Sequence, residues 1–358
     1  MNSIFVAGLG AVSPAGWDVA ALRTALDQGR PLPLQSLVRP GTDQSLPARL
    51  VTNPLTRPAF LAHPRLRRSS PVTHYAVAAA LEALSGLRAA AGASKPRLGV
   101  IVSLQSGCVQ YSTRFYGETL KNPATASPLI FPETVYAAPA SHVAALLENV
   151  VLAYSLVGDP AAFLQAVAIG SEWLAEQRVD ACLVIGAEET HWIIADALRL
   201  LDRQTVLAAG AGALCLCREP IGSAVVELSA ITDAHTITAR QPKAQAAQAM
   251  RQQLGQNPAA SLLVEGTGVS PRSDEAERAA WQGWSGARVR PKQILGEGMM
   301  AAAAWQCVAA CDAIGSGKFT AVDVSLVGSN QAIGARFIRG PSRISDLSNA
   351  ASAGTMPA

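Results

Sequence analysis

The chain has 358 residues, of which 49% are hydrophobic and 15% charged, and its formal net charge at pH 7 is +3. This composition is typical of a well-buried α/β protein, and the charge is too small and dispersed for a nucleic-acid-binding domain. The first residues lack the features of a signal peptide, and no segment approaches about 18 uninterrupted apolar residues, so we expect a cytoplasmic protein without a membrane span.

Apolar strand-like runs alternate with alanine- and leucine-rich helical patterns over residues 1–218. This alternation predicts βαβ units and a mostly parallel sheet. The expected strands cover residues 4–9, 99–104, 151–156, 181–185 and 211–217. The expected helices cover residues 19–26, 74–84 and 161–177.

The same alternation restarts after Pro220. The expected strands cover residues 223–230, 261–264, 287–289, 322–327 and 335–338, and the expected helices 243–254, 274–284 and 299–314. Five strand candidates in each part predict an internal duplication, with one half over residues 1–218 and the other over 219–340. Residues 341–358 have no apolar periodicity and are expected to form a flexible tail.

The segment Gly158-Asp159-Pro160 lies between a predicted strand and a predicted helix. Enzymes often mount a nucleophile on such a turn, because it exposes one side chain beside a helix N-terminus that stabilises negative charge. Here Asp159 is expected to cap the helix and Pro160 to occupy its first turn. The turn therefore has the geometry for a nucleophile but carries a helix-capping aspartate and a proline.

Four stretches, taken in order, resemble the β-ketoacyl-acyl-carrier-protein synthases of the thiolase superfamily. They read FVAGLGAVSPAG at 5–16, LRRSSPVTHYAVAAA at 66–80, FPETVYAAPASHVA at 131–144 and VDACLVIGAEE at 179–189. The resemblance implies an α/β fold of two similar five-strand halves in alternating helix and sheet layers. It also implies dimers that form through a strand of the first half, and we expect no cofactor and no metal.

The family's chemistry, as the resemblance implies it, uses a cysteine on a strand-to-helix turn, two histidines from the second half and a Gly-rich loop. The cysteine thiolate takes the acyl chain as a thioester. The histidines stabilise the thioester oxygen during decarboxylative condensation. Counting back along the family's spacing from Asp180 places the cysteine position at Pro160, beside Asp159, and residues 109–181 contain no cysteine.

Both histidine positions are also changed. The first is Glu265 in EGTGVSP, and the second is Glu297 in KQILGEGMMAA. An ionised glutamate only accepts hydrogen bonds, so it cannot donate one to a thioester oxygen. If the two glutamates lie close together, repulsion raises the pKa of one of them unless Arg272, Lys292 or a partner's cation intervenes.

The loop at 326–332 reads LVGSNQA where the family has a Gly-Phe-Gly-Gly run, and it is expected to form a hairpin turn. The six cysteines lack disulfide-framework and CxxC spacing, so we interpret them as small buried residues. Cys108, at a strand end, is the one candidate for a relocated nucleophile, and it has no identifiable base. The five histidines are interpreted as surface or packing residues.

The first hypothesis is a non-catalytic, chain-length-factor-type subunit that pairs with an active ketosynthase, and the resemblance extends to the short ketosynthase-like proteins of aryl-polyene-type pathways. The partner strand is expected to pair from Val151 to Leu156. Acyl carrier protein is acidic, so a basic face is expected to meet it, and Arg65, Arg67 and Arg68 are candidates.

Two alternatives remain open. One is an acyltransferase or hydrolase of the thiolase fold that uses the carboxylates Asp159, Glu265 and Glu297. The other is a homodimeric acyl-binding or scaffolding protein with no catalytic partner.

Overall fold

The computed structural model describes residues 3–91, 95–147, 149–221, 225–256, 261–269 and 271–341. Most of the expected tail, from residue 342 onward, lies outside the described residues, as do residues 223 and 224 of one expected strand and the side chain of Arg272. Within the described ranges no helix combines the length and the apolar character needed to cross a membrane.

In the part of the chain that the structure describes, the main strands form one large, continuous 11-stranded sheet, in which the five strands of the first half lie in the order β5-β4-β6-β8-β1. The strands are β1 (Ile4–Val12), β4 (Leu98–Leu104), β5 (Val150–Val157), β6 (Ala181–Glu188) and β8 (Gly210–Cys217). β4 is parallel to β5 and β6, whereas β8 runs antiparallel to both β6 and β1, so the sheet is mixed and the prediction of a mostly parallel sheet is wrong. All five strands expected from the sequence are confirmed.

The second half repeats this arrangement in the order β12-β11-β13-β14-β9. Its strands are β9 (Val226–Ile231), β11 (Leu262–Glu265), β12 (Ala287–Val289), β13 (Ala321–Val327) and β14 (Gln331–Arg339), and the short β10 (His235–Thr236) pairs with β14. β11 is parallel to β12 and β13, and β14 is antiparallel to β13 and β9. Strand order and direction are therefore the same in both halves, which confirms the duplication.

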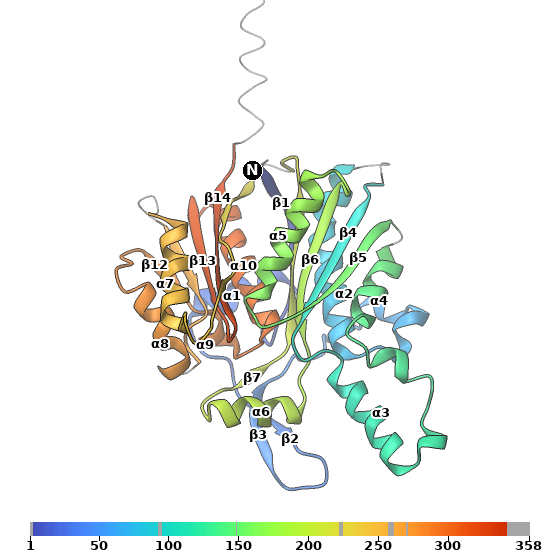
Figure 1. Cartoon of the computed structure of the whole chain (residues 1–358). Helices are drawn as coiled ribbons and strands as arrows, with labels where there is room; N and C mark the ends of the chain where they lie inside the picture. The colour runs from blue at the N-terminus through green and yellow to red at the C-terminus, as the bar shows by residue number, and fades with distance from the viewer. Residues whose placement is uncertain are drawn as a thin grey trace, which may run out of the picture.

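Helices and sheets alternate in layers (Figure 1). The helices α5 (Ala162–Ala175) and α10 (Met300–Gly315) lie in the middle and contact strands of both halves. On one outer side, α2 (Pro71–Ala91) packs on β1 and β8, and α4 (Ala138–Leu147) packs against α2. On the other outer side, α7 (Lys243–Leu254) packs on β14, and α8 (Pro271–Ala280) packs against α7. The expected layered fold is confirmed, whereas the boundaries after residues 218 and 340 stay predictions.

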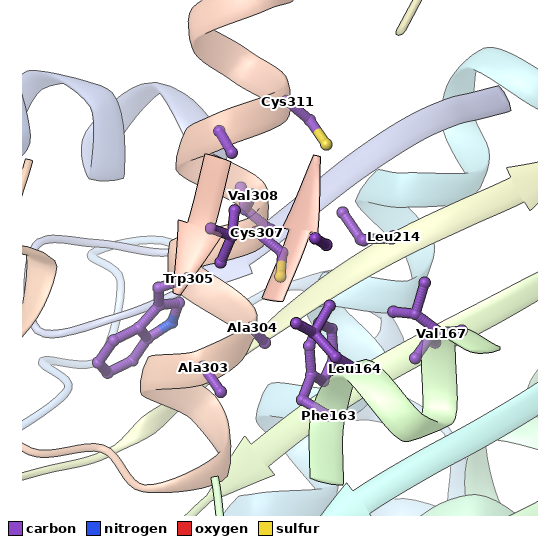
Figure 2. Packing of buried hydrophobic residues seen from close by; sticks show 14 of the residues in the cluster. Phe163, Leu164, Val167, Leu214, Ala303, Ala304, Trp305, Cys307, Val308 and Cys311 are labelled. Carbon is purple, nitrogen blue, oxygen red and sulfur yellow. The ribbon is translucent and has the colours of Figure 1, made fainter. Parts of the chain in front are cut away.

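The middle layer is packed closely because small residues let α10 approach the sheet. A Cβ atom on Gly212 of β8 would lie 2.7 Å from the Cβ atom of Ala304. Figure 2 shows Ala304 of α10 near Phe163 of α5, whereas Trp305 points away from α5. The Trp305 indole N–H donates to the carbonyls of Val12 and Ala211, so this side chain joins α10 to β1 and β8.

Several elements were not expected from the sequence. They are a small sheet of β2 (Gln35–Val38), β3 (Ser45–Arg49) and β7 (Leu207–Ala208), and the helices α3 (Val109–Lys121), α6 (Trp192–Leu201) and α9 (Pro291–Leu295). Helix α1 (Val19–Gln28) was expected, and the short 3-10 turns are η1 (Ala59–Ala62), η2 (Pro64–Arg68), η3 (Pro123–Thr125) and η4 (Phe131–Glu133). The prediction that α8 reaches residue 284 is wrong, because the helix ends at Ala280. The carbonyls of Trp281 and Trp284, beyond that end, accept hydrogen bonds from the Arg288 side chain instead.

Candidate functional site

Both halves contribute to a cavity of about 170 Å³ at the carboxyl ends of their strands. Gln105 and Pro160 come after β4 and β5, and Gly266 and Gly328 come directly after β11 and β13. In α/β proteins, ligands commonly bind at the carboxyl ends of the strands. Glu297 also lines this cavity. The cavity therefore brings together Pro160 and Glu297, two of the positions singled out from the sequence.

Asp159 does not cap α5, so that prediction is wrong. The helix begins after Ala161, and no side chain caps it. The N–H groups of its first turn bind backbone carbonyls instead. The Asp159 carboxylate instead accepts the backbone N–H of Asn330 at 2.7 Å and the side-chain amide of Gln331 at 3.2 Å. It is 4% exposed, and the neighbouring Pro160 lines the cavity.

The turn at residues 328–331 is the expected hairpin. It joins β13 to β14, and the N–H of Gly328 donates to the carbonyl of Gln331. The contact with Asp159 therefore links the strand-to-helix turn of the first half to this hairpin of the second half.

Glu265 ends β11 and is fully buried. Its carboxylate accepts Nη1 of Arg288 at 3.0 Å and Nε of Arg290 at 2.6 Å. Arg288 lies on β12, next to β11, and a spacing of two residues directs alternate side chains to the same face. Glu265 is therefore bound between two guanidinium groups and is not among the residues that line the cavity.

Glu297 lies at the N-terminal end of α10. Its carboxylate accepts Nζ of Lys292 at 2.8 Å and the backbone N–H of Met299 at 2.7 Å. Met299 has a positive φ of 48°, a conformation that non-glycine residues adopt rarely and that the Glu297 hydrogen bond helps to hold. Burial opposes the charged form of Lys292, but the carboxylates of Glu297, Glu277 and Asp274 together outweigh this effect and raise the pKa of Lys292.

The two glutamates therefore do not share one site. Glu265 is neutralised by Arg288 and Arg290, and Glu297 by Lys292, one of the cations expected to intervene. The paired-carboxylate chemistry considered for Glu265 and Glu297 lacks a direct contact between them.

Glu277 of α8 is a cavity residue that the sequence reasoning did not single out. It is buried, and its carboxylate accepts the N–H of Gly266 at 3.0 Å. Burial raises the pKa of Glu277 to about 7, against hydrogen bonds from Ser325 and Gly266. The signal in the sequence that could have identified Glu277 is its spacing of three residues from Asp274, which places both side chains on the same side of α8.

Lys243, the first residue of α7, also lines the cavity. Burial lowers the pKa of its ammonium, and the nearby Glu277 carboxylate opposes that shift. The cavity is thus lined by buried charges of both signs rather than by a nucleophile and its base.

All six cysteines are free and buried. Cys108 is 1% exposed, its Sγ donates to the carbonyl of Val135, and burial followed by the nearby Glu189 raises the pKa of its thiol. Within the described part of the chain no histidine or cysteine lines the cavity. The described residues also contain no group of three or more His, Cys, Asp or Glu side chains able to hold a metal ion.

β5 forms one edge of the large sheet. The apolar side chains of Val151, Tyr154 and Val157 are each more than half exposed on it. Elsewhere, Arg65, Arg67 and Arg68 are exposed on η2. An exposed apolar edge strand offers unpaired backbone groups to another chain.

The sequence matches no protein-family model and no curated protein. Solved structures are similar over nearly the whole chain. A β-ketoacyl synthase from Burkholderia phymatum aligns with a TM-score of 0.79 and 18% identity, covering 95% of this chain and 100% of that chain. The ketosynthase ApeO in complex with its chain length factor ApeC, from Xenorhabdus doucetiae, gives 0.75 and 15%, covering 95% and 98%.

A third similar structure is AntDE:AntF, a type II polyketide synthase acyl-carrier protein in complex with its ketosynthase. It aligns with a TM-score of 0.75 and 15% identity, covering 95% of this chain and 99% of that chain. Because these alignments cover nearly the whole of each chain with TM-scores of 0.75–0.79, the chain has the thiolase-like fold of the ketosynthases and chain length factors.

Proposed function

We propose that the chain is a non-catalytic subunit of the chain-length-factor type, which pairs with an active ketosynthase during acyl-chain elongation on an acyl carrier protein. One observation carries the proposal. At the three positions where the family resemblance places the catalytic cysteine and histidines stand Pro160, Glu265 and Glu297, and both carboxylates are bound within the chain.

Thioester formation requires a thiolate within reach of the acyl group. Pro160 supplies no reactive atom, and the buried thiols of the chain are held in their neutral form, as the raised pKa of Cys108 illustrates. Condensation also requires donors that stabilise the thioester oxygen. The carboxylates of Glu265 and Glu297 act as acceptors and are already bound by Arg288, Arg290 and Lys292.

Pairing through β5 is the second part of the proposal. A partner strand that adds to this edge would bury Val151, Tyr154 and Val157 and would satisfy the outer backbone groups of β5. Among the similar structures, ApeO is a ketosynthase in complex with its chain length factor. The same arrangement would let this chain complete an assembly whose chemistry resides in its partner.

The acyl carrier protein is the third component of the proposal. Such proteins are acidic, and the exposed arginines of η2, Arg65, Arg67 and Arg68, offer a compact positive surface. The narrower proposal, a role in aryl-polyene-type pathways, rests on the sequence resemblance.

Co-expression with a ketosynthase that retains the catalytic cysteine and both histidines tests the proposal. We expect a stable complex with one copy of each chain, and elongation activity that disappears when the partner's nucleophilic cysteine is replaced. The isolated chain should show no acyl turnover. A homodimer that does not exchange with the ketosynthase would instead support the scaffolding alternative.

A second candidate is an acid–base acyltransferase or hydrolase, and the carboxyl group of Glu277 favours it. A carboxyl whose pKa is about 7, inside a cavity, is suited to proton transfer at neutral pH. This candidate predicts acyl turnover by the purified chain that is lost in Glu277→Gln. Turnover that persists in Glu277→Gln, or its absence in the purified chain, would exclude it.

A further inference from the structure

The hairpin turn between β13 and β14 receives a carboxylate from the other half of the chain. Oδ2 of Asp159 accepts the N–H of Asn330 at 2.7 Å, across 171 positions of sequence. Oδ1 accepts Nε2 of Gln331, which also donates to Oε1 of Gln165 at 3.1 Å. Two donors of one turn thus converge on both oxygens of a single carboxylate.

The turn has space for this carboxylate because residue 328 is glycine. A Cβ atom on Gly328 would lie 2.1 Å from Oδ2 of Asp159, well inside any tolerated contact. Any other residue type would therefore displace the carboxylate. A donor pair and a matching space together make a built site rather than a chance contact of two surfaces.

We propose that the turn at Gly328, Asn330 and Gln331 is a carboxylate-binding site, and that Asp159 is its built-in ligand. The backbone N–H of Asn330 is therefore already engaged and cannot polarise the carbonyl group of an acyl chain. Pro160, Gly328 and Ser329 all line the adjacent cavity. Asp159 thus engages the donors of a turn that borders this cavity.

The consequence for catalysis rests on the proposed function, but the binding site itself does not. Removal of the Asp159 side chain should leave a vacant site that takes a small monocarboxylate such as formate or acetate. A carboxylate is the favoured ligand because hydrogen bonds from N–H groups to a charged acceptor are stronger than those to a neutral one.

The test is the melting temperature of the full chain carrying Asp159→Gly, with its ketosynthase partner if the complex is the soluble form. In sodium chloride the variant should melt below the wild type. Sodium formate at equal ionic strength should raise its melting temperature in a saturable manner, by about 2 °C or more. A formate effect no larger in the variant than in the wild type would overturn the proposal.

Asp159→Asn is the matched control, because an asparagine fills the same space and leaves no room for formate. It should be insensitive to formate. Rescue of this variant equal to that of Asp159→Gly would mean that formate acts elsewhere, and would also overturn the proposal.

Gly328→Ala supplies a second test that does not depend on an added ligand. The new Cβ atom should expel the Asp159 carboxylate and lower the melting temperature. Combining it with Asp159→Gly should restore part of the loss, because the clash is then absent. A double variant that melts at the temperature expected from independent effects would show that the carboxylate does not occupy the turn.

Failure of these tests is distinct from failure of the proposed function. Formate binding is measured without substrate, whereas the proposed function fails only if the isolated chain turns over acyl groups or does not pair with a ketosynthase.

Discussion

Nζ of Lys292 lies 2.8 Å from Oε2 of Glu297, and the two side chains are only 11% and 13% exposed. The pair lies beside the cavity at the N-terminal end of α10, and the second carboxylate oxygen of Glu297 accepts the N–H of Met299. A carboxylate is stabilised near a helix N-terminus. Glu297 therefore has a structural role at the position where the family resemblance places a catalytic histidine.

Removal of one member of this pair should be costly. Lys292→Met leaves the Glu297 carboxylate buried without its cation, and we expect a loss of about 3–5 kcal/mol in the free energy of unfolding. The double variant Lys292→Met with Glu297→Leu should recover much of that loss. Part of the loss should remain, because the N–H of Met299 no longer has the Glu297 carboxylate as its acceptor. Urea denaturation measures each value.

The pair of Lys318 and Asp27 is a matched control, because its N···O distance is 2.7 Å but its side chains are 44% and 55% exposed. Lys318→Met should cost no more than about 1 kcal/mol. Equal losses for Lys292→Met and Lys318→Met would contradict a buried, coupled role for the first pair.

Glu277 should make stability depend on pH in an unusual sense. Burial raises its pKa in the folded state from the ordinary 4.5 to about 7. The folded state therefore binds the proton more tightly, so this contribution is complete below pH 4.5 and is lost as pH rises toward 7. The loss is at most about 3 kcal/mol over that window, and Glu277→Gln should remove it from a series of urea titrations.

Glu118 provides the contrast for this experiment. The N–H of Ser127 lowers the pKa of Glu118, so its contribution is lost as pH falls rather than as pH rises. Glu118→Gln should therefore alter the acidic end of the profile in the opposite sense. A Glu277→Gln profile parallel to that of the wild type between pH 4.5 and 7 would contradict the raised pKa.

The periodic parts of the fold could be predicted from the sequence because burial imposes a pattern on it. All ten main strands lie where apolar runs indicate, and α7 matches its expected residues. By contrast, α3 and α6 are amphipathic helices whose apolar faces stay largely exposed, since α3 buries no residue and α6 buries only Ala195, and both were missed.

The site was less accessible from the sequence because its contacts join distant segments. Local rules assigned Asp159 to the nearest helix, but its donors are residues 330 and 331. The guanidinium groups that bind Glu265 become neighbours only through the register that pairs Leu263 with Arg288. Lys292, five residues from Glu297, was within the reach of local reasoning and was named as a possible cation.

The edge strand β5 should decide assembly. Tyr154→Lys places a charge in the surface that we propose the ketosynthase covers, and it should abolish co-purification of the two chains. Leu200→Lys on α6 is the control, since Leu200 is also an exposed apolar residue but lies away from this strand. Size-exclusion chromatography with light scattering measures the stoichiometry, and an intact heterodimer with Tyr154→Lys would exclude pairing through β5.

Restoring the family's catalytic residues should not restore catalysis. A variant with Pro160→Cys, Glu265→His and Glu297→His regains the side-chain types, but Asp159 still engages the N–H of Asn330. Arg288, Arg290 and Lys292 also lose their carboxylate partners, which should lower the stability of this variant.

We therefore expect no acyl adduct on residue 160 of this variant in intact-protein mass spectrometry, even with excess acyl thioester. Adding Asp159→Gly to the triple variant would free the N–H of Asn330, and is the change most suited to permit acylation. Acylation of the triple variant without Asp159→Gly would show that the hydrogen bond between Asp159 and Asn330 is not what separates this chain from a catalytic ketosynthase. Acylation only after that fourth change would place the loss of function in the wall of the cavity as much as in the missing nucleophile.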